Sequence, residues 1–268
     1  MTTARLPITI PIHPWFRDHC FNDKIILPAV ETLLLLATEV NKKYPEIDIR
    51  VMEDARFTRF LEIPPQSTSL DALVDCSRTA DGSIQAKLLS RVQFKAMARI
   101  FEHGEVVFPA AKKNEPSVTY PEPMEGVVTE ISANRIYREL VPFGPAYQAL
   151  QETLSLSAHG ASGIVKAPAL PETEIMKQLG SPFPLDGALH AACVHGRQSV
   201  NFTPFPVGFD QRIVICATRP GENYQTKVFL IDRTEDQLVY DLKIFDMDGR
   251  NCETVTGIRM RKAIDHDL

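Results

Sequence analysis

The chain has 268 residues, a formal net charge of −5 and 44% hydrophobic residues, as an ordinary globular protein does. The mild acidity disfavours nucleic-acid binding, and no apolar run is long enough to cross a bilayer. Five widely spaced cysteines without a CxxC pair, and no signal peptide, predict a cytoplasmic protein with reduced thiols and no membrane partner.

The first part of the chain predicts a strand, a helix and then more strands. Residues 6–12 alternate loosely, as an edge strand does. Pro28 suits the first turn of a helix over 29–43 that is apolar on nearly every side and ends at Tyr44-Pro45. Strand-length runs follow, separated by turn signals, at 48–61, 68–79, 83–94 and 98–108.

The segment 111–123 is rich in proline and charge, which predicts a linker between a unit at 1–110 and a second at 124–268. In the second unit, residues 183–186 lead into an apolar helix of small residues. Strand-like runs at 209–218, 223–232 and 237–249 follow it. Two buried helices, each wrapped by an antiparallel sheet, predict an α+β fold, and the absence of crossover βαβ units disfavours a doubly wound sheet.

Motifs for phosphate loops, dinucleotides, serine hydrolases and zinc proteases are missing from the sequence. His190 and His195 are five residues apart, so they point to different faces of the helix, unlike a metal-binding pair. We therefore expect no metal.

Two constellations can carry chemistry. His19 stands just before the apolar run Ile25 to Leu27, and Asp186 stands four residues before His190, which puts that pair on one helix face. The structural interpretation is that Asp186 caps its helix and His19 is a partly buried histidine bonded to the backbone. Residue type and spacing alone favour this interpretation over catalysis.

Three segments, in order, resemble the motifs of polyketide synthase dehydratase domains. The stretch HCFNDKIILP resembles HxxxGxxxxP, with His19 and Pro28 in place and Asp23 at the glycine. The stretch LDGALH resembles DxxxQ/H through Asp186 and His190. The stretch LVPFGPAYQAL resembles YGPxF, with these residues as supporting ones: Phe143 in place of tyrosine, Gly144, Pro145 and the aromatic Tyr147.

The resemblance implies a double hotdog fold with one active site between the halves. It implies a hydro-lyase that removes water from a 3-hydroxyacyl thioester to give a 2-enoyl thioester. Since no electrons move in this reaction, we expect no cofactor. His19 would be the base and Asp186 the acid, oriented by His190. An acid role requires a carboxyl whose pKa is raised by desolvation.

The implied partners are an acyl carrier protein or coenzyme A thioester, other polyketide synthase components and a second copy in a homodimer. A basic patch would receive an acidic carrier, with these candidates: Arg56, Arg59, Arg91, Lys95 and Arg99. Two alternatives stay open. One is a double-bond isomerase or product-template-like cyclase on the same fold. The other is a non-catalytic acyl-binding domain, which is suggested by Asp23 and Phe143 because they replace the glycine and tyrosine of the family motifs.

Overall fold

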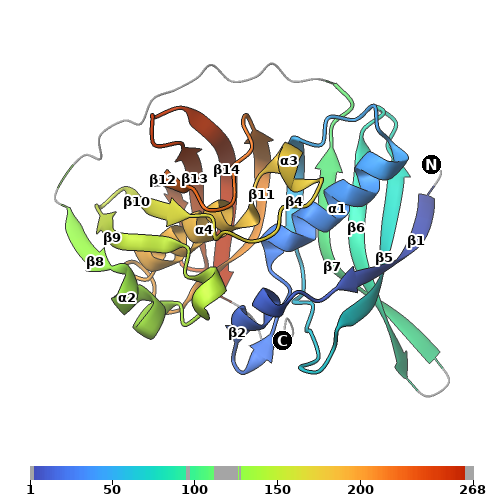
Figure 1. Cartoon of the computed structure of the whole chain (residues 1–268), viewed down its shortest axis with the longest axis horizontal. Coiled ribbons are helices and arrows are strands. Elements are labelled where there is room, and N and C mark those ends of the chain that lie inside the picture. Colours follow the sequence, from blue (N-terminus) through green and yellow to red (C-terminus); the bar gives the residue numbers. More distant parts are fainter. Residues whose placement is uncertain (1–2, 95–96, 112–125, 127, 263–268) are drawn as a thin grey trace.

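The computed structural model describes residues 3–94, 97–111, 126 and 128–262. Within them, twelve strands form one antiparallel sheet, and two long helices, α1 and α4, pack against it (Figure 1). The sheet order is β1-β5-β6-β7-β4-β11-β14-β13-β12-β10-β9-β8. The bounds are β1 (Thr3–Pro11), β4 (Val51–Phe57), β5 (Ser69–Arg78), β6 (Ile84–Phe94), β7 (Met97–Phe108), β8 (Thr129–Ser132), β9 (Leu150–Leu156), β10 (Gly160–Lys166), β11 (Pro204–Val214), β12 (Asn223–Arg233), β13 (Gln237–Phe245) and β14 (Asn251–Lys262).

Helix α1 (Ala29–Lys43) has the bounds that the sequence predicts. Its fully buried side chains, such as Leu36, Ala37 and Val40, pack into the core that it shares with β5, β6 and β7. Strand β1 lies at the edge of the sheet, also as predicted. Its two prolines, Pro7 and Pro11, suit an edge strand because they donate no ladder hydrogen bond.

Helix α4 (Pro182–Gly196) begins four residues before Asp186, so the prediction that residues 183–186 only lead into the helix is wrong. Pro182 and Pro184 fall in the first turn, where a backbone N–H has no partner within the helix and its loss is harmless. Almost every side chain of α4 is buried. A Cβ on Gly187 would lie 2.9 Å from Ala149 Cβ and 3.0 Å from Val165 Cγ1, so a small residue is needed where α4 meets β10.

The two parts of the sheet join where β4 pairs with β11. Gly208 approaches Ala55 so closely that a Cβ would lie 2.1 Å from the Ala55 carbonyl oxygen. Next to this junction, the buried Arg212 donates a 2.7 Å hydrogen bond from Nε to Glu253 on β14. Strands from both parts thereby form one continuous surface around α1 and α4, and the helices also contact each other.

The sequence interpretation assigned no elements to residues 129–181, where the structure has β8, α2 (Ala133–Arg135), a π-helix (Ile136–Leu140), β9, β10 and α3 (Met176–Leu179). Glycines within β10 weaken its strand pattern. Residues 112–123 of the predicted linker lie outside the described residues, and the division into two units stays a prediction. None of the helices in the described ranges is long and apolar enough to cross a membrane.

Candidate active site

A two-residue hairpin positions His19. Strands β2 (Cys20–Phe21) and β3 (Lys24–Ile25) are joined by Asn22 and Asp23, whose φ angles are 49° and 61°. Two consecutive positive φ angles are the requirement of a type I′ turn, which asparagine and aspartate accept better than most residues. Asp23 therefore meets the backbone demand at the position where the resembled motif has glycine, and its side chain is exposed.

His19 is bonded to Ile26 from both directions. The Ile26 N–H donates to the His19 carbonyl at 3.0 Å, and the His19 ring donates from Nδ1 to the Ile26 carbonyl at 2.9 Å. Since a carbonyl only accepts, the neutral ring carries its proton on Nδ1 and leaves Nε2 with a free lone pair. Burial lowers the pKa of His19, which favours the neutral ring that can accept a proton.

A loop from the second half of the chain holds the other side of the ring. Phe143 stacks on His19 with ring centroids 4.3 Å apart, and Tyr147 meets it edge-on at 5.0 Å. The loop is fixed by Asp18, which accepts from the Gly144 N–H through its carbonyl and from the Ala146 N–H through Oδ2, both at 2.8 Å. A Cβ on Gly144 would lie 2.6 Å from Asp18 Cγ, so this contact needs glycine.

Helix α4 supplies the carboxyl. Asp186 and His190 are both 5% exposed, and Asp186 Oδ2 lies 3.1 Å from His190 Nε2. The contact has the distance of an ion pair but not the angles of a hydrogen bond. Both atoms lack a hydrogen-bonding partner within the described part of the chain. Asp186 lies in the second turn of α4, so the prediction that it caps the helix is wrong.

Tyr137, in the π-helix, contacts the nitrogen of His190 that faces away from Asp186. Its hydroxyl oxygen accepts from the Leu150 N–H at 2.8 Å and lies 3.2 Å from His190 Nδ1. When the Tyr137 hydroxyl donates to Nδ1, a proton of the His190 ring stands on Nε2, the nitrogen that faces Asp186.

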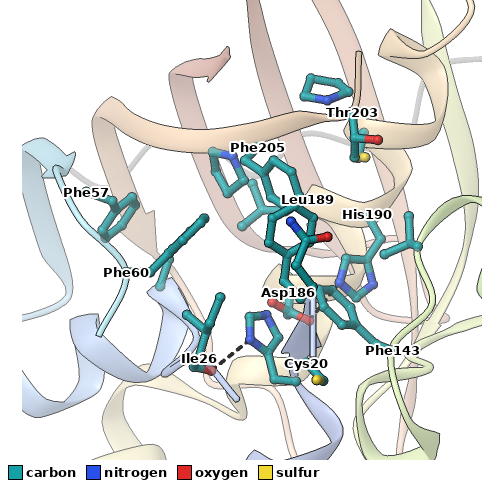
Figure 2. Close-up of a pocket in the computed structure, with 18 of the residues that line it drawn as sticks. Cys20, Ile26, Phe57, Phe60, Phe143, Asp186, Leu189, His190, Thr203 and Phe205 are labelled. Atoms are coloured by element: carbon teal, nitrogen blue, oxygen red, sulfur yellow. Dashed lines mark hydrogen bonds and ion pairs between the residues drawn. The ribbon is translucent and has the colours of Figure 1, made fainter. Parts of the chain in front are cut away.

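These groups meet in one cavity of about 330 Å³. His19, Phe143, Asp186 and His190 line it, although the first comes from the hairpin before α1 and the others from the far half of the chain. Figure 2 shows the Asp186 carboxyl between Phe143 and Ile26, with His190 beside Phe143. The other predicted supporting residues stand behind this lining: Pro28 is the N-cap of α1, Pro145 begins a short 3₁₀ helix, and Gly144 and Tyr147 hold the loop.

The rest of the cavity wall is aromatic. Phe57, Phe60 and Phe205 lie on the side away from His190 (Figure 2). Phe205 and Phe60 both pack against Phe21, at ring distances of 4.6 Å and 6.1 Å. The exposed lining residues, which mark the opening to solvent, include Asn22, Arg59, Glu139 and Arg197. The cavity thus offers an apolar chamber with two polar reacting groups at one end and two arginines at its opening.

A second carboxyl stands close to the site without lining the cavity. Glu31, in the first turn of α1, is mostly buried, and burial together with the nearby Asp186 raises its pKa to about 8. The Tyr147 hydroxyl has no hydrogen-bonding partner among the described residues. Burial, followed by the Glu31 and Asp186 carboxyls, raises the pKa of Tyr147.

Sequence reasoning missed Asp18, Glu31 and Tyr137. Asp18 adjoins the motif histidine and Glu31 lies three residues after the motif proline, so position alone could have drawn attention to both. Tyr137 belongs to no motif. Its only local signal is structural, since a single turn of π-helix often marks a functional site.

Comparison with known proteins gives one family. The family model described as polyketide synthase dehydratase N-terminal domain matches residues 115–268. No curated protein matches the chain.

Solved structures resemble the chain over nearly its whole length. A trans-AT polyketide synthase dehydratase domain from Brevibacillus brevis has a TM-score of 0.76 at 16% identity, covering 98% of this chain and 94% of that one. The bifunctional dehydratase-cyclase domain in ambruticin biosynthesis has a TM-score of 0.73 at 19% identity, covering 98% of this chain and 92% of that one. The dehydratase domain of a mycocerosic acid synthase-like polyketide synthase has a TM-score of 0.74 at 14% identity, covering 97% of this chain and 92% of that one. The double hotdog fold expected from the sequence is thus confirmed.

Proposed function

The chain belongs to the polyketide synthase dehydratase family, and from this we propose that it removes water from a 3-hydroxyacyl thioester during polyketide biosynthesis. One observation carries the proposal. A histidine that bonds the backbone through Nδ1 and leaves Nε2 to accept a proton, and a buried carboxyl, come from remote parts of the chain and line the same largely apolar cavity. An elimination needs a base and an acid placed in this way.

In the proposed reaction His19 acts first on carbon 2 of the acyl group. Its Nε2 takes the proton, and the electron pair of that C–H bond forms the double bond between carbons 2 and 3. The bond from Nδ1 to the Ile26 carbonyl holds the ring in the correct tautomer and favours the cation that forms.

Asp186 completes the elimination by giving a proton to the hydroxyl on carbon 3. The C–O bond then breaks, water leaves, and Asp186 is left as the carboxylate facing His190. The proton on His19 must return to Asp186 before the next turnover.

The thioester oxygen also needs a donor when charge builds on it. Helix α1 begins at the cavity with Ala29, and N–H groups in the first turn of a helix have no partner within it. We assign this end of α1 to the thioester oxygen, because such donors stabilise an enolate-like charge where it develops.

The family works on substrates carried by acyl carrier protein. We propose that this chain takes its substrate from such a carrier or from coenzyme A, acts with other polyketide synthase components, forms a homodimer and works in the cytoplasm. Of the predicted basic patch, Arg59 lines the cavity opening, where the unpredicted Arg197 joins it. Arg56, Arg91 and Arg99 do not line the cavity, and Lys95 lies outside the described residues.

The test is incubation of the full chain with 3-hydroxyacyl thioesters on coenzyme A and on a carrier protein, followed by mass spectrometry. We expect loss of one water, and a fall in rate of about 10²–10⁴-fold in His19→Ala and in Asp186→Asn. His159→Ala and Asp236→Asn are matched controls, since both residues are exposed and neither lines the cavity.

Three outcomes would contradict the proposal. An unchanged mass with a new absorbance band would indicate an isomerase or cyclase. Binding of the carrier without turnover, equal in wild type and His19→Ala, would indicate an acyl-binding domain. Full activity in either site variant would remove that residue from the chemistry.

A further inference from the structure

Two cysteines lie against each other at one end of the β11–β14 ladder, outside the cavity lining. The N–H groups of Ile215 and Cys216 both donate to the Cys252 carbonyl, at 2.8 Å and 3.1 Å. Two residues thus oppose one, as in a β-bulge, which re-aims a side chain. A disulfide needs Cα atoms about 4.4–6.8 Å apart, and the hydrogen bond between the Cys216 N–H and the Cys252 carbonyl brings the two backbones close together.

The two thiols differ in exposure and in charge. Cys216 is exposed, whereas Cys252 is 2% exposed. The Cys216 thiol donates to the Asn251 carbonyl at 4.0 Å, and the Cys252 thiol donates to the Arg250 carbonyl at 3.7 Å. The neighbouring Cys252 thiol lowers the pKa of Cys216, and Arg250 and Arg219 add to this effect against burial and the Asp246 carboxylate. The neighbouring Cys216 thiol and burial raise the pKa of Cys252. An accessible thiol with a lowered pKa beside a buried thiol is the arrangement of an oxidisable pair.

We propose that Cys216 and Cys252 are a modification site that forms a reversible intramolecular disulfide on exposure to a peroxide. The Cys216 thiolate attacks one oxygen of hydrogen peroxide, the O–O bond breaks, the other oxygen leaves as hydroxide, and a sulfenic acid forms. The Cys252 sulfur then attacks the Cys216 sulfur, the S–O bond breaks, and the thiol proton leaves with the hydroxide as water. The two sulfurs lose two electrons, and the peroxide gains them.

The position of the pair gives the bridge a mechanical consequence. Two residues after Cys216, Thr218 accepts from the Ser181 N–H at 3.0 Å and donates from Oγ1 to the Ser181 carbonyl at 3.2 Å. Ser181 is the N-cap of α4. A disulfide between residues 216 and 252 would therefore link β14 covalently to the segment that holds the N-terminus of α4. The oxidised protein should then melt at a higher temperature than the reduced one.

The experiment treats the reduced full chain with hydrogen peroxide and then alkylates the remaining thiols in denaturant. We expect the protein to lose two of its five thiols, to yield a peptide linking residues 216 and 252, and to recover both thiols with dithiothreitol. The Cys216→Ser variant should keep all its thiols after peroxide treatment, and its melting temperature should not change with peroxide. The Cys76→Ala variant, changed at a buried site on β5, is the control that should still lose two thiols.

The proposal is overturned if Cys216 is oxidised beyond the sulfenic acid while Cys252 remains alkylated. A link between two chains, or a link that uses another cysteine, would overturn it as well. None of these readouts depends on dehydratase activity, so the result is independent of the proposed function.

Discussion

Removal of the Tyr137 hydroxyl should damage stability and turnover together. This oxygen accepts from the Leu150 N–H at 2.8 Å and lies 3.2 Å from His190 Nδ1, and the side chain is 6% exposed. Tyr137→Phe keeps the ring and its packing but removes both interactions. The Leu150 N–H then has no acceptor in a residue that is 2% exposed.

The size of the loss follows from these contacts. A buried donor left without an acceptor costs about 1–3 kcal/mol. In a protein of this size each kcal/mol lowers Tm by about 2–4 °C, so we expect a fall of roughly 2–12 °C. His190 also loses the group that fixes its ring opposite Asp186. A misplaced acid should lower kcat by about 10–100-fold, with little change in KM, because Tyr137 does not line the cavity.

Thermal unfolding and steady-state kinetics on a 3-hydroxyacyl thioester measure the two effects. Tyr44→Phe is the matched control, because Tyr44 is a partly buried tyrosine and does not line the cavity. Its ring lies beneath the cations of Lys43 and Arg78. An unchanged Tm in Tyr137→Phe would refute the hydrogen-bond reasoning. A lowered Tm with wild-type kcat would refute the positioning of Asp186 through His190.

Three further predictions concern buried charges. Burial lowers the pKa of His19 below its usual 6.5, so kcat/KM should fall only as pH drops through this lowered value, and an acid limb at pH 7 would contradict a neutral His19 base. The pKa of Glu31 is raised from 4.5 to about 8, so the folded state holds a proton that the unfolded state releases, and stability is lost as pH rises from 4.5 through 8. Glu31→Gln should therefore raise Tm relative to wild type at pH 8 but not at pH 4, and an equal difference at both would count against the burial of this carboxyl. Arg212→Ala should destabilise by about 3–5 kcal/mol in urea unfolding, because it leaves Glu253 buried without its partner. The double variant Arg212→Met, Glu253→Met should recover most of that loss, and no recovery would contradict the electrostatic cause.

Local patterns in the sequence determined much of the architecture. The spacing of apolar residues and the Pro28 and Tyr44-Pro45 signals gave the bounds of α1. Alternation over Leu238 to Ile244 gave β13, whose inward side chains are fully buried. The i, i+4 spacing was sufficient to place Asp186 beside His190, because four residues are about one helical turn.

What no local pattern decided was the meeting of remote segments. The sequence could suggest His19 with Asp186 only through resemblance, since their common cavity depends on β4 pairing with β11 and on α1 touching α4. The bonds of Tyr137 to Leu150 and His190, and the contact of Asp18 with the loop at Gly144, have no counterpart in spacing. Periodicity indicates which face of an element is apolar, whereas the packing of the whole chain determines what that face contacts. The site is formed by segments that only this packing brings together.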